Sequence, residues 1–143
     1  MSKRIKWTLV IIWMITIFWF SNQPAVISDE KSKFVIYLFK TLGLNLDNIL
    51  GQLANFIVRK AAHFTEYMIL YILLFNALNE SFKLKKALIL SLAIVFLYSC
   101  SDELHQYFIP GRTARVRDVI IDTCGGIFAL LMLYLRRKSL LKK

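Results

Sequence analysis

Four long apolar runs constrain the fold of this chain more than any other feature of its sequence. They extend over Trp7 to Phe20, about Phe56 to Leu78, Ala87 to Cys100, and Val119 to Leu135. A bilayer-spanning helix needs roughly 20 mostly apolar residues, and the shorter runs approach that length by continuing into flanks whose polar side chains can snorkel. Hydrophobic residues make up 57% of the 143, which is more than one soluble core of this size needs.

These runs predict an all-α, polytopic membrane protein built as a bundle of four transmembrane helices. We expect the helices to span about residues 5–21, 56–78, 85–107 and 117–136 of a single transmembrane domain, residues 1–143. Lys3 and Arg4 precede the first run as basic residues precede the apolar core of a signal peptide. Because no small-x-small cleavage pattern follows in "SNQPAVISDE", we predict that the first helix is retained.

The basic residues predict the orientation of the bundle. With the N-terminus inside, four spans place eleven basic residues and a single acidic one, Glu80, at the inner ends. The outer side then carries eight basic and eight acidic residues, so the formal charge of +10 falls on the inner side. This is the asymmetry that the positive-inside rule describes. We therefore predict cytoplasmic N- and C-termini, and the high charge requires no nucleic-acid partner.

The segment between the first two runs, "SDEKSKFVIYLFKTLGLNLDNILGQLANF", begins with polar residues and is too long for a tight turn. Phe34, Tyr37 and Leu38 recur in it at helical spacing, which favours an amphipathic helix lying on the outer membrane surface. Gly43 and Asn45 are expected to end this helix. The alternative is an ordinary connecting loop with a single helical turn.

Polar residues form a stripe on the second predicted span, in "FIVRKAAHFTEYMIL". At 100° per residue, Arg59, His63 and Glu66 share one helix face, with Lys60 and Tyr67 beside them. At 1.5 Å per residue, His63 lies about 6 Å and Glu66 about 10 Å deeper in the membrane than Arg59. An ionisable group at such a depth is costly unless it has a partner or faces a wet cavity. We therefore expect the stripe to point into the bundle.

The third and fourth spans carry polar residues at the same predicted depth. In "YSCSDELHQYF" four side chains share an arc, and His105 lies just outside it; the four are Ser99, Asp102, Glu103 and Gln106. In "RVRDVIIDTCGG", Asp118 and Asp122 are one turn apart, and Gly125 continues their face. Three helices thus bring polar groups to the outer edge of the bilayer.

Two further features support a close assembly of this layer. Gly125 and Gly126 remove side-chain bulk where the fourth helix would approach its neighbours. The turn "IPGR", Ile109 to Arg112, is expected to end the third helix and to return the Arg112 guanidinium over the carboxylates.

The motifs together resemble the VanZ-like family of small bacterial membrane proteins. "RKAAHFTEY" follows a first span ending in "FSNQP" and precedes "SDELHQYFIPGR" and "DVIIDTCGG", so the resemblance runs from about Phe20 to Gly126. The family pattern falls here on Lys60, His63, Glu66, Tyr67, Asp102, Glu103, His105, Gln106, Pro110, Gly111, Arg112, Asp118 and Asp122. The resemblance implies the plasma membrane of a bacterium and a link to the cell envelope, because the namesake is associated with low-level resistance to the lipid-tailed glycopeptide teicoplanin. It implies no particular reaction.

The polar layer contains the parts for acid–base chemistry, because a histidine lies three residues from a glutamate and faces further carboxylates. We assign candidate catalytic roles to His63, Glu66, Asp102, Glu103 and Asp122, and substrate-binding roles to Arg59, Lys60, Tyr67, His105, Gln106, Arg112 and Asp118. The same residues are also compatible with a buried salt-bridge network that only holds the helices together. "HFTE" is not H-E-x-x-H and no span carries two histidines, so we predict no metal and no cofactor.

The leading functional prediction is an envelope protein whose outer polar pocket binds, and on one hypothesis processes, a lipid-linked or lipid-tailed polar molecule. The expected partners are membrane lipids, together with a lipid-linked cell-wall precursor or a lipoglycopeptide. Two alternatives remain: a small oligomeric transporter with an intramembrane coupling carboxylate, and a non-catalytic structural partner of an envelope complex. Charges gathered at one membrane edge favour the pocket over the transporter.

Overall fold

The computed structural model describes residues 1–140, apart from the side chains of Asp47, Gln52 and residues 138–140, and this part contains helices but no strand. Four helices are long and apolar enough to cross a membrane, which confirms the predicted fold class. These are α1 (Lys3–Ser21), α4 (Ala54–Leu78), α5 (Leu84–Gln106) and α6 (Val116–Leu140). The segment between α1 and α4 forms α2 (Ala25–Thr41), α3 (Leu46–Leu50) and the 3-10 helix η1 (Gly51–Leu53).

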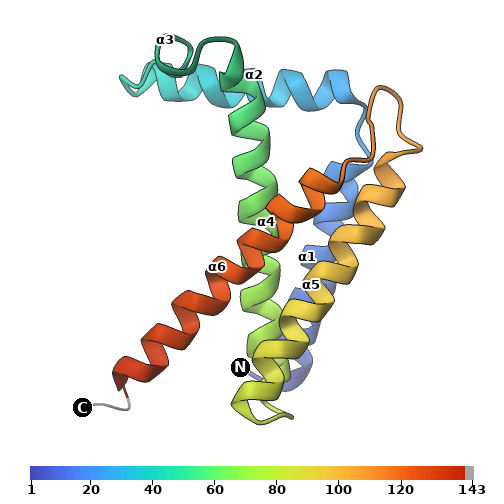
Figure 1. Cartoon of the computed structure of the whole chain (residues 1–143), viewed down its shortest axis with the longest axis vertical. Coiled ribbons are helices and arrows are strands. Elements are labelled where there is room, and N and C mark those ends of the chain that lie inside the picture. Colours follow the sequence, from blue (N-terminus) through green and yellow to red (C-terminus); the bar gives the residue numbers. More distant parts are fainter. Residues whose placement is uncertain (141–143) are drawn as a thin grey trace.

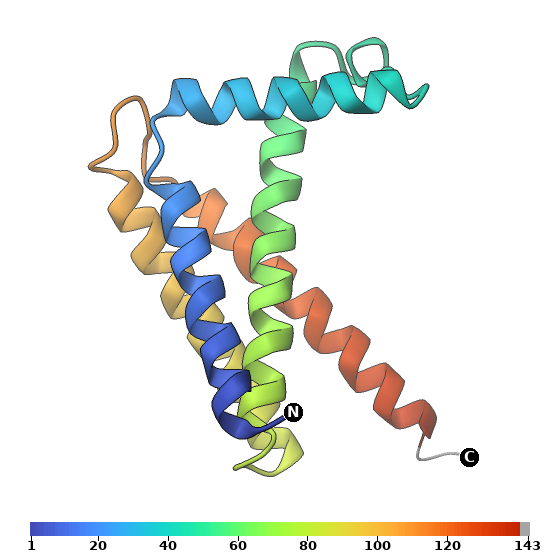
Figure 2. The ribbon, with the colours of Figure 1, turned by 180° about the vertical axis from the view of Figure 1, so that it is seen from behind.

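The four long helices alternate in direction, so both termini lie at one end of the bundle (Figure 1). Helix α2 lies across the opposite end and crosses the start of α4, and Figure 2 shows the same crossing from behind. The predicted amphipathic segment is therefore a helix, and it ends just before Gly43 as expected. The loop alternative is wrong, because the segment forms 17 residues of continuous helix.

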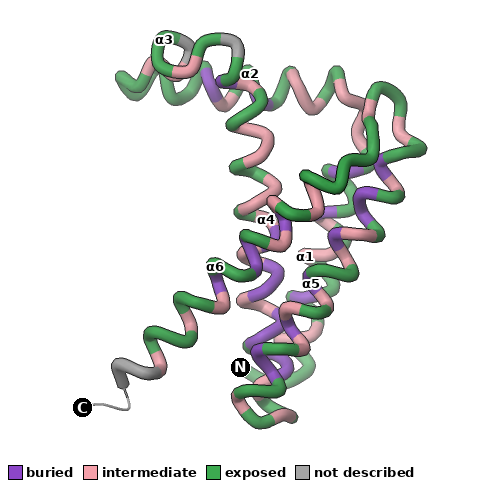
Figure 3. The backbone as a smooth tube through the Cα atoms, in the orientation of Figure 1, coloured by how far each residue is buried: buried purple, intermediate pink, exposed green. Residues whose placement is uncertain are grey.

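The buried residues are concentrated in α4 and α5 (Figure 3), and α4 packs against α1, α2, α5 and α6. Tyr67, Leu70, Tyr71 and Leu74 of α4 are all within 1% of complete burial. Large apolar side chains on α1 and α6 point outward instead, including Ile12 and Leu135. An exposed apolar surface of this kind is what a helix presents to lipid tails.

Hydrogen bonds between side chains and carbonyls connect neighbouring helices. Trp13 of α1 donates to the Glu66 carbonyl of α4 at 2.9 Å, and Tyr98 of α5 donates to the Met14 carbonyl at 2.7 Å. Tyr71 donates to the Leu88 carbonyl at 3.1 Å. Because lipid tails are as apolar as the helix surfaces, the hydrophobic effect does not drive helices together within a bilayer. Hydrogen bonds of this kind therefore contribute to their association.

The glycine pair of α6 makes the close approach that its position predicted. A Cβ atom added at Gly125 would overlap the backbone carbonyl oxygen of Phe64 in α4. One added at Gly126 would lie 2.9 Å from Cγ1 of Val95 in α5. Helix α6 therefore packs backbone against backbone on α4, just beyond Asp122 and His63.

Candidate functional site

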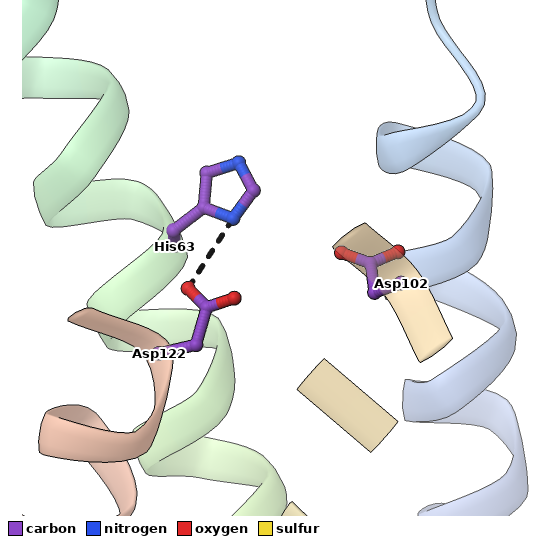
Figure 4. A group of neighbouring side chains, drawn as sticks. All are labelled: His63, Asp102 and Asp122. Carbon is purple, nitrogen blue, oxygen red and sulfur yellow. Dashed lines mark ion pairs between the residues drawn. The ribbon is translucent and has the colours of Figure 1, made fainter. Parts of the chain in front are cut away.

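A compact cluster of three side chains lies where α4, α5 and α6 meet. His63, Asp102 and Asp122 each contribute one nitrogen or oxygen atom, and these atoms all lie within 4.8 Å of one another (Figure 4). His63 Nδ1 is 3.4 Å from Asp122 Oδ1, an ion-pair distance. Both aspartates are almost fully buried, with exposed fractions of 4% and 1%. The predicted convergence of three helices on one layer is thus present in the structure.

In each aspartate of the cluster, one carboxylate oxygen accepts a hydrogen bond from a side chain of α5. The hydroxyl of Ser99, which is completely buried, donates to Asp122 Oδ2 at 3.4 Å. The Gln106 amide donates to Asp102 Oδ2 at 3.1 Å. The second oxygen of each carboxylate, Oδ1, has no hydrogen-bond partner among the described residues. Of these two oxygens, Asp122 Oδ1 has the ion-pair contact with His63 Nδ1, whereas Asp102 Oδ1 has neither a hydrogen bond nor an ion pair among the described residues.

Arg112 reaches the cluster through Gln106 rather than directly. Its guanidinium donates to Gln106 Oε1 at 3.0 Å and to the backbone carbonyls of Gln23 at 2.8 Å and Phe20 at 3.3 Å. The expectation that Arg112 returns over the carboxylates stays a prediction, since its described hydrogen bonds go to Gln106 and to these carbonyls. Burial lowers the pKa of the Arg112 guanidinium, and neighbouring Arg59 lowers it further, yet arginine stays charged at neutral pH.

The "IPGR" turn positions Arg112 by docking on the start of α2. Gly111 has φ +76°, a left-handed conformation that favours glycine, and its missing side chain leaves room for Ala25. The Pro110 carbonyl accepts a hydrogen bond from the Ala25 N–H at 3.3 Å. Hydrogen bonds of the turn thereby connect it to α2 through Ala25 and to α1 through Phe20.

Two ion pairs join α4 to its neighbours nearer the α2 end. Lys60 Nζ lies 2.7 Å from Asp118 Oδ2 of α6, and both side chains are mostly buried. Arg59 Nη1 lies 2.8 Å from Asp29 Oδ1 of α2. Sequence reasoning missed Asp29, because its position in a polar connecting segment carries no periodic signal that assigns it to a site.

Two predicted site residues have contacts outside the cluster. Glu103 is buried, and its carboxylate accepts a hydrogen bond from the backbone N–H of Arg115, which places it against the chain that leads into α6. His105 stacks on Phe18 with ring centroids 4.7 Å apart and lies 3.2 Å from Asn22 Oδ1. His105 therefore packs against α1, as its place just outside the polar arc of α5 allows.

Tyr67 and Glu66 border the cluster on α4. Tyr67 is fully buried, and its hydroxyl has no hydrogen-bond partner among the described residues. Glu66 is half-buried and lines two neighbouring hollows of the surface. Glu66 can therefore take part in binding without first breaking a described ion pair or hydrogen bond of its side chain, whereas Tyr67 lines neither hollow.

A polar cavity of about 300 Å³ opens beside the cluster, between the end of α1, α2 and α4. Its polar lining consists of Ser21, Gln23, Ser28, Lys31, Ser32, Arg59, His63, Glu66 and Arg112. An apolar groove of about 400 Å³ continues from it under α2 and shares four lining residues with it: Val35, Val58, Ala62 and Glu66. The rest of the groove is lined by Trp13, Phe39, Ala61, Thr65 and Ile69.

A second, smaller cavity of about 130 Å³ adjoins the first and is strongly basic. It is lined by four arginines and Lys60 against a single carboxylate, Asp118. Arg59 and Arg112 line both cavities, so they stand between them. Arginine side chains in such an arrangement suit a doubly or multiply charged anion.

The fold and the buried polar layer together define a multi-pass α-helical membrane protein with a charged site near one end of its bundle. The VanZ/LLP1 family model matches residues 6–137, nearly the whole chain, and the protein belongs to this family. Searches of curated proteins and of solved structures find no significant match. The resemblance read from the motifs is confirmed.

Proposed function

We propose that this protein binds a lipid-linked or lipid-tailed polar molecule at the extracytoplasmic face of the bacterial plasma membrane. The observation that carries the proposal is the continuity of the polar cavity with the apolar groove under α2. A ligand with a polar head and an apolar tail needs such a pair of compartments side by side. Neither a soluble metabolite nor a plain hydrocarbon would use both.

The charges favour an anionic head group. Arg59 and Arg112 stand between the polar and the basic cavity, so phosphate or carboxylate oxygens in either one lie within their reach. Ser28, Ser32 and Gln23 line the polar cavity and supply hydroxyl and amide groups for the uncharged part of a head group. A diphosphate-linked lipid sugar has this combination of groups.

The apolar groove favours a chain rather than a second head group. Its named residues are aliphatic or aromatic apart from Thr65 and Glu66, and it lies on the side of α4 that faces α2 and α1. Burial of a methylene group there contributes about 0.8 kcal/mol. A prenyl or acyl tail entering from the outer leaflet would occupy it without leaving the membrane.

The family relationship adds lipid-tailed glycopeptides to the candidate ligands. A protein that captures an acyl tail and an adjoining polar body at the outer leaflet would lower the amount of teicoplanin that reaches its target. A glycopeptide without the lipid tail would escape this capture. Cells that express the protein should therefore be protected from teicoplanin but not from a glycopeptide that lacks the lipid tail.

Titration of the purified protein tests the binding proposal directly. Trp13 lines the groove, so ligand entry should change tryptophan fluorescence. We expect a prenyl diphosphate to bind at least tenfold more tightly than the matching prenyl alcohol, because a hydrogen bond to a charged group contributes about 1.5–3 kcal/mol. Arg112→Gln should remove most of that preference.

Arg136→Gln is the matched control, since Arg136 is an exposed arginine at the opposite end of α6. It should leave both affinities unchanged. Equal affinity for diphosphate and alcohol, or equal loss in the two arginine variants, would contradict an anionic head group at this site.

A further inference from the structure

The His63–Asp102–Asp122 cluster has the donor set of a divalent transition-metal site. Its three ligand atoms come from three different helices and lie within 4.8 Å of one another. The separation of His63 Nδ1 and Asp122 Oδ1, 3.4 Å, equals the ligand–ligand spacing of about 3.4 Å in a tetrahedral zinc site with bonds of about 2.1 Å. Figure 4 shows the Asp102 carboxylate on the far side of the space that the other two groups border.

An independent observation points to a ligand between these groups. Among the described residues, Asp102 Oδ1, Asp122 Oδ1 and His63 Nδ1 have no hydrogen-bond partner, the two aspartates are 4% and 1% exposed, and the His63–Asp122 contact is an ion pair only when the imidazole is protonated. Leaving a buried neutral polar group without a hydrogen bond costs about 1–3 kcal/mol, and leaving a buried charged oxygen without a partner costs more. The atoms that lack partners are thus on the same three residues that form the cluster.

Charge balance favours a dication over a protonated histidine. A protonated His63 would pair with Asp122, whereas the direct hydrogen-bond partner of Asp102 is the neutral Gln106, with the Arg112 guanidinium on the other side of that amide. A divalent cation bound by two carboxylates and a neutral imidazole has no net charge. It would also satisfy all three atoms at once.

We propose that His63, Asp102 and Asp122 bind one divalent transition-metal cation of the Zn²⁺ or Mn²⁺ kind. One imidazole nitrogen with two carboxylate oxygens suits these ions better than Mg²⁺ or Ca²⁺, which take oxygen ligands almost entirely. The prediction of no metal rested on ligand spacing along single helices, whereas this site is assembled from three. The proposal does not depend on which ligand the neighbouring cavity takes.

The test is metal binding to the full-length protein in detergent after chelation and removal of the chelator. Incubation with Zn²⁺ or Mn²⁺ and desalting should leave about one equivalent of one of these ions per chain, and the unfolding temperature should rise. Asp102→Asn and Asp122→Asn should each weaken binding at least tenfold. Glu30→Gln, at an exposed position of α2, should retain full binding.

Co²⁺ provides a readout on the unmutated protein, so the proposal stays testable if an aspartate variant fails to fold. Bound Co²⁺ should show visible absorption of nitrogen and oxygen ligation without thiolate charge-transfer bands. Thiolate bands would assign the ion to Cys100 or Cys124 and overturn the site. So would the absence of binding by all three ions, or equal loss of binding in Glu30→Gln and Asp122→Asn.

Discussion

Gly125 of α6 lies directly against the backbone carbonyl of Phe64 in α4, and this contact sets the distance between Asp122 and His63. Phe64 follows His63 in sequence, and Gly125 lies one turn after Asp122. Any side chain at position 125 would move the two helices apart at the level of the site. A small residue in a packing position therefore controls the geometry of two charged residues.

The first prediction compares Gly125→Ala with Gly126→Ala. The added methyl at position 125 meets backbone, which cannot move aside, whereas at 126 it meets Cγ1 of Val95, a side-chain atom. We expect Gly125→Ala to lower the free energy of unfolding by about 3 kcal/mol and Gly126→Ala by about 1 kcal/mol. Unfolding in detergent measures both, and equal losses would show that α4 and α6 do not pack backbone on backbone.

A second prediction concerns the two ion pairs of α4. The Lys60 and Asp118 side chains are 15% and 13% exposed, while those of Arg59 and Asp29 are 28% and 40% exposed. Lys60→Gln should cost about 2–3 kcal/mol, because it leaves a mostly buried carboxylate with only the more exposed Arg117, whose Nε lies 3.7 Å from Asp118 Oδ1. Arg59→Gln should cost less than about 1 kcal/mol and become milder in salt. Double-mutant cycles at two salt concentrations measure the coupling energy of each pair. A larger coupling energy for Arg59 and Asp29 than for Lys60 and Asp118 would contradict this order.

Glu66→Gln separates a binding site from a scaffold. No described ion pair includes the Glu66 carboxylate, so its neutralisation strands no partner. The variant should accumulate and unfold like the parent protein, within about 0.5 kcal/mol, yet lose ligand affinity at the cavity that it lines. Exposed Glu30→Gln is the control. A loss of about 3–5 kcal/mol in Glu66→Gln would instead identify a buried charge network.

Topology can be measured with single cysteines in a protein that lacks Cys100 and Cys124. Asn22→Cys, between α1 and α2, and Ser81→Cys, between α4 and α5, are both at exposed positions. With cytoplasmic termini, an impermeant thiol reagent should label only the first in intact cells. Labelling of Ser81→Cys alone would place the polar cavity on the cytoplasmic side and contradict the proposed function.

Acid should weaken the end of the bundle where Lys6 pairs with Glu80. Lys6 lowers the pKa of the Glu80 carboxyl below its ordinary 4.5, so the pair stabilises the fold above that pH and the contribution is lost as the pH falls through the lowered value. Glu80→Gln should remove this part of the pH dependence. The unfolding temperatures of variant and parent should differ at pH 7 and converge in acid, and curves that stay parallel over this range would exclude the pair.

The sequence alone determined the features that depend on local hydropathy and helical period. Four apolar runs predict four spans, and α1, α4, α5 and α6 begin and end within a few residues of them. Helical spacing likewise predicted that α4, α5 and α6 carry polar faces at a common level. The close approach of Gly125 and Gly126 also followed, because only glycine leaves room for a neighbouring backbone.

Only the tertiary structure decided which polar groups meet. Arg59 pairs with Asp29 of α2, Arg112 contacts Gln106 and the α1 carbonyls, and His105 turns to Phe18. A helical pattern specifies the face on which a residue lies, but not the rotation of that helix against its neighbours or the distance between their axes. Those two quantities come from packing at contacts such as Gly125 on Phe64, which join segments far apart in the chain.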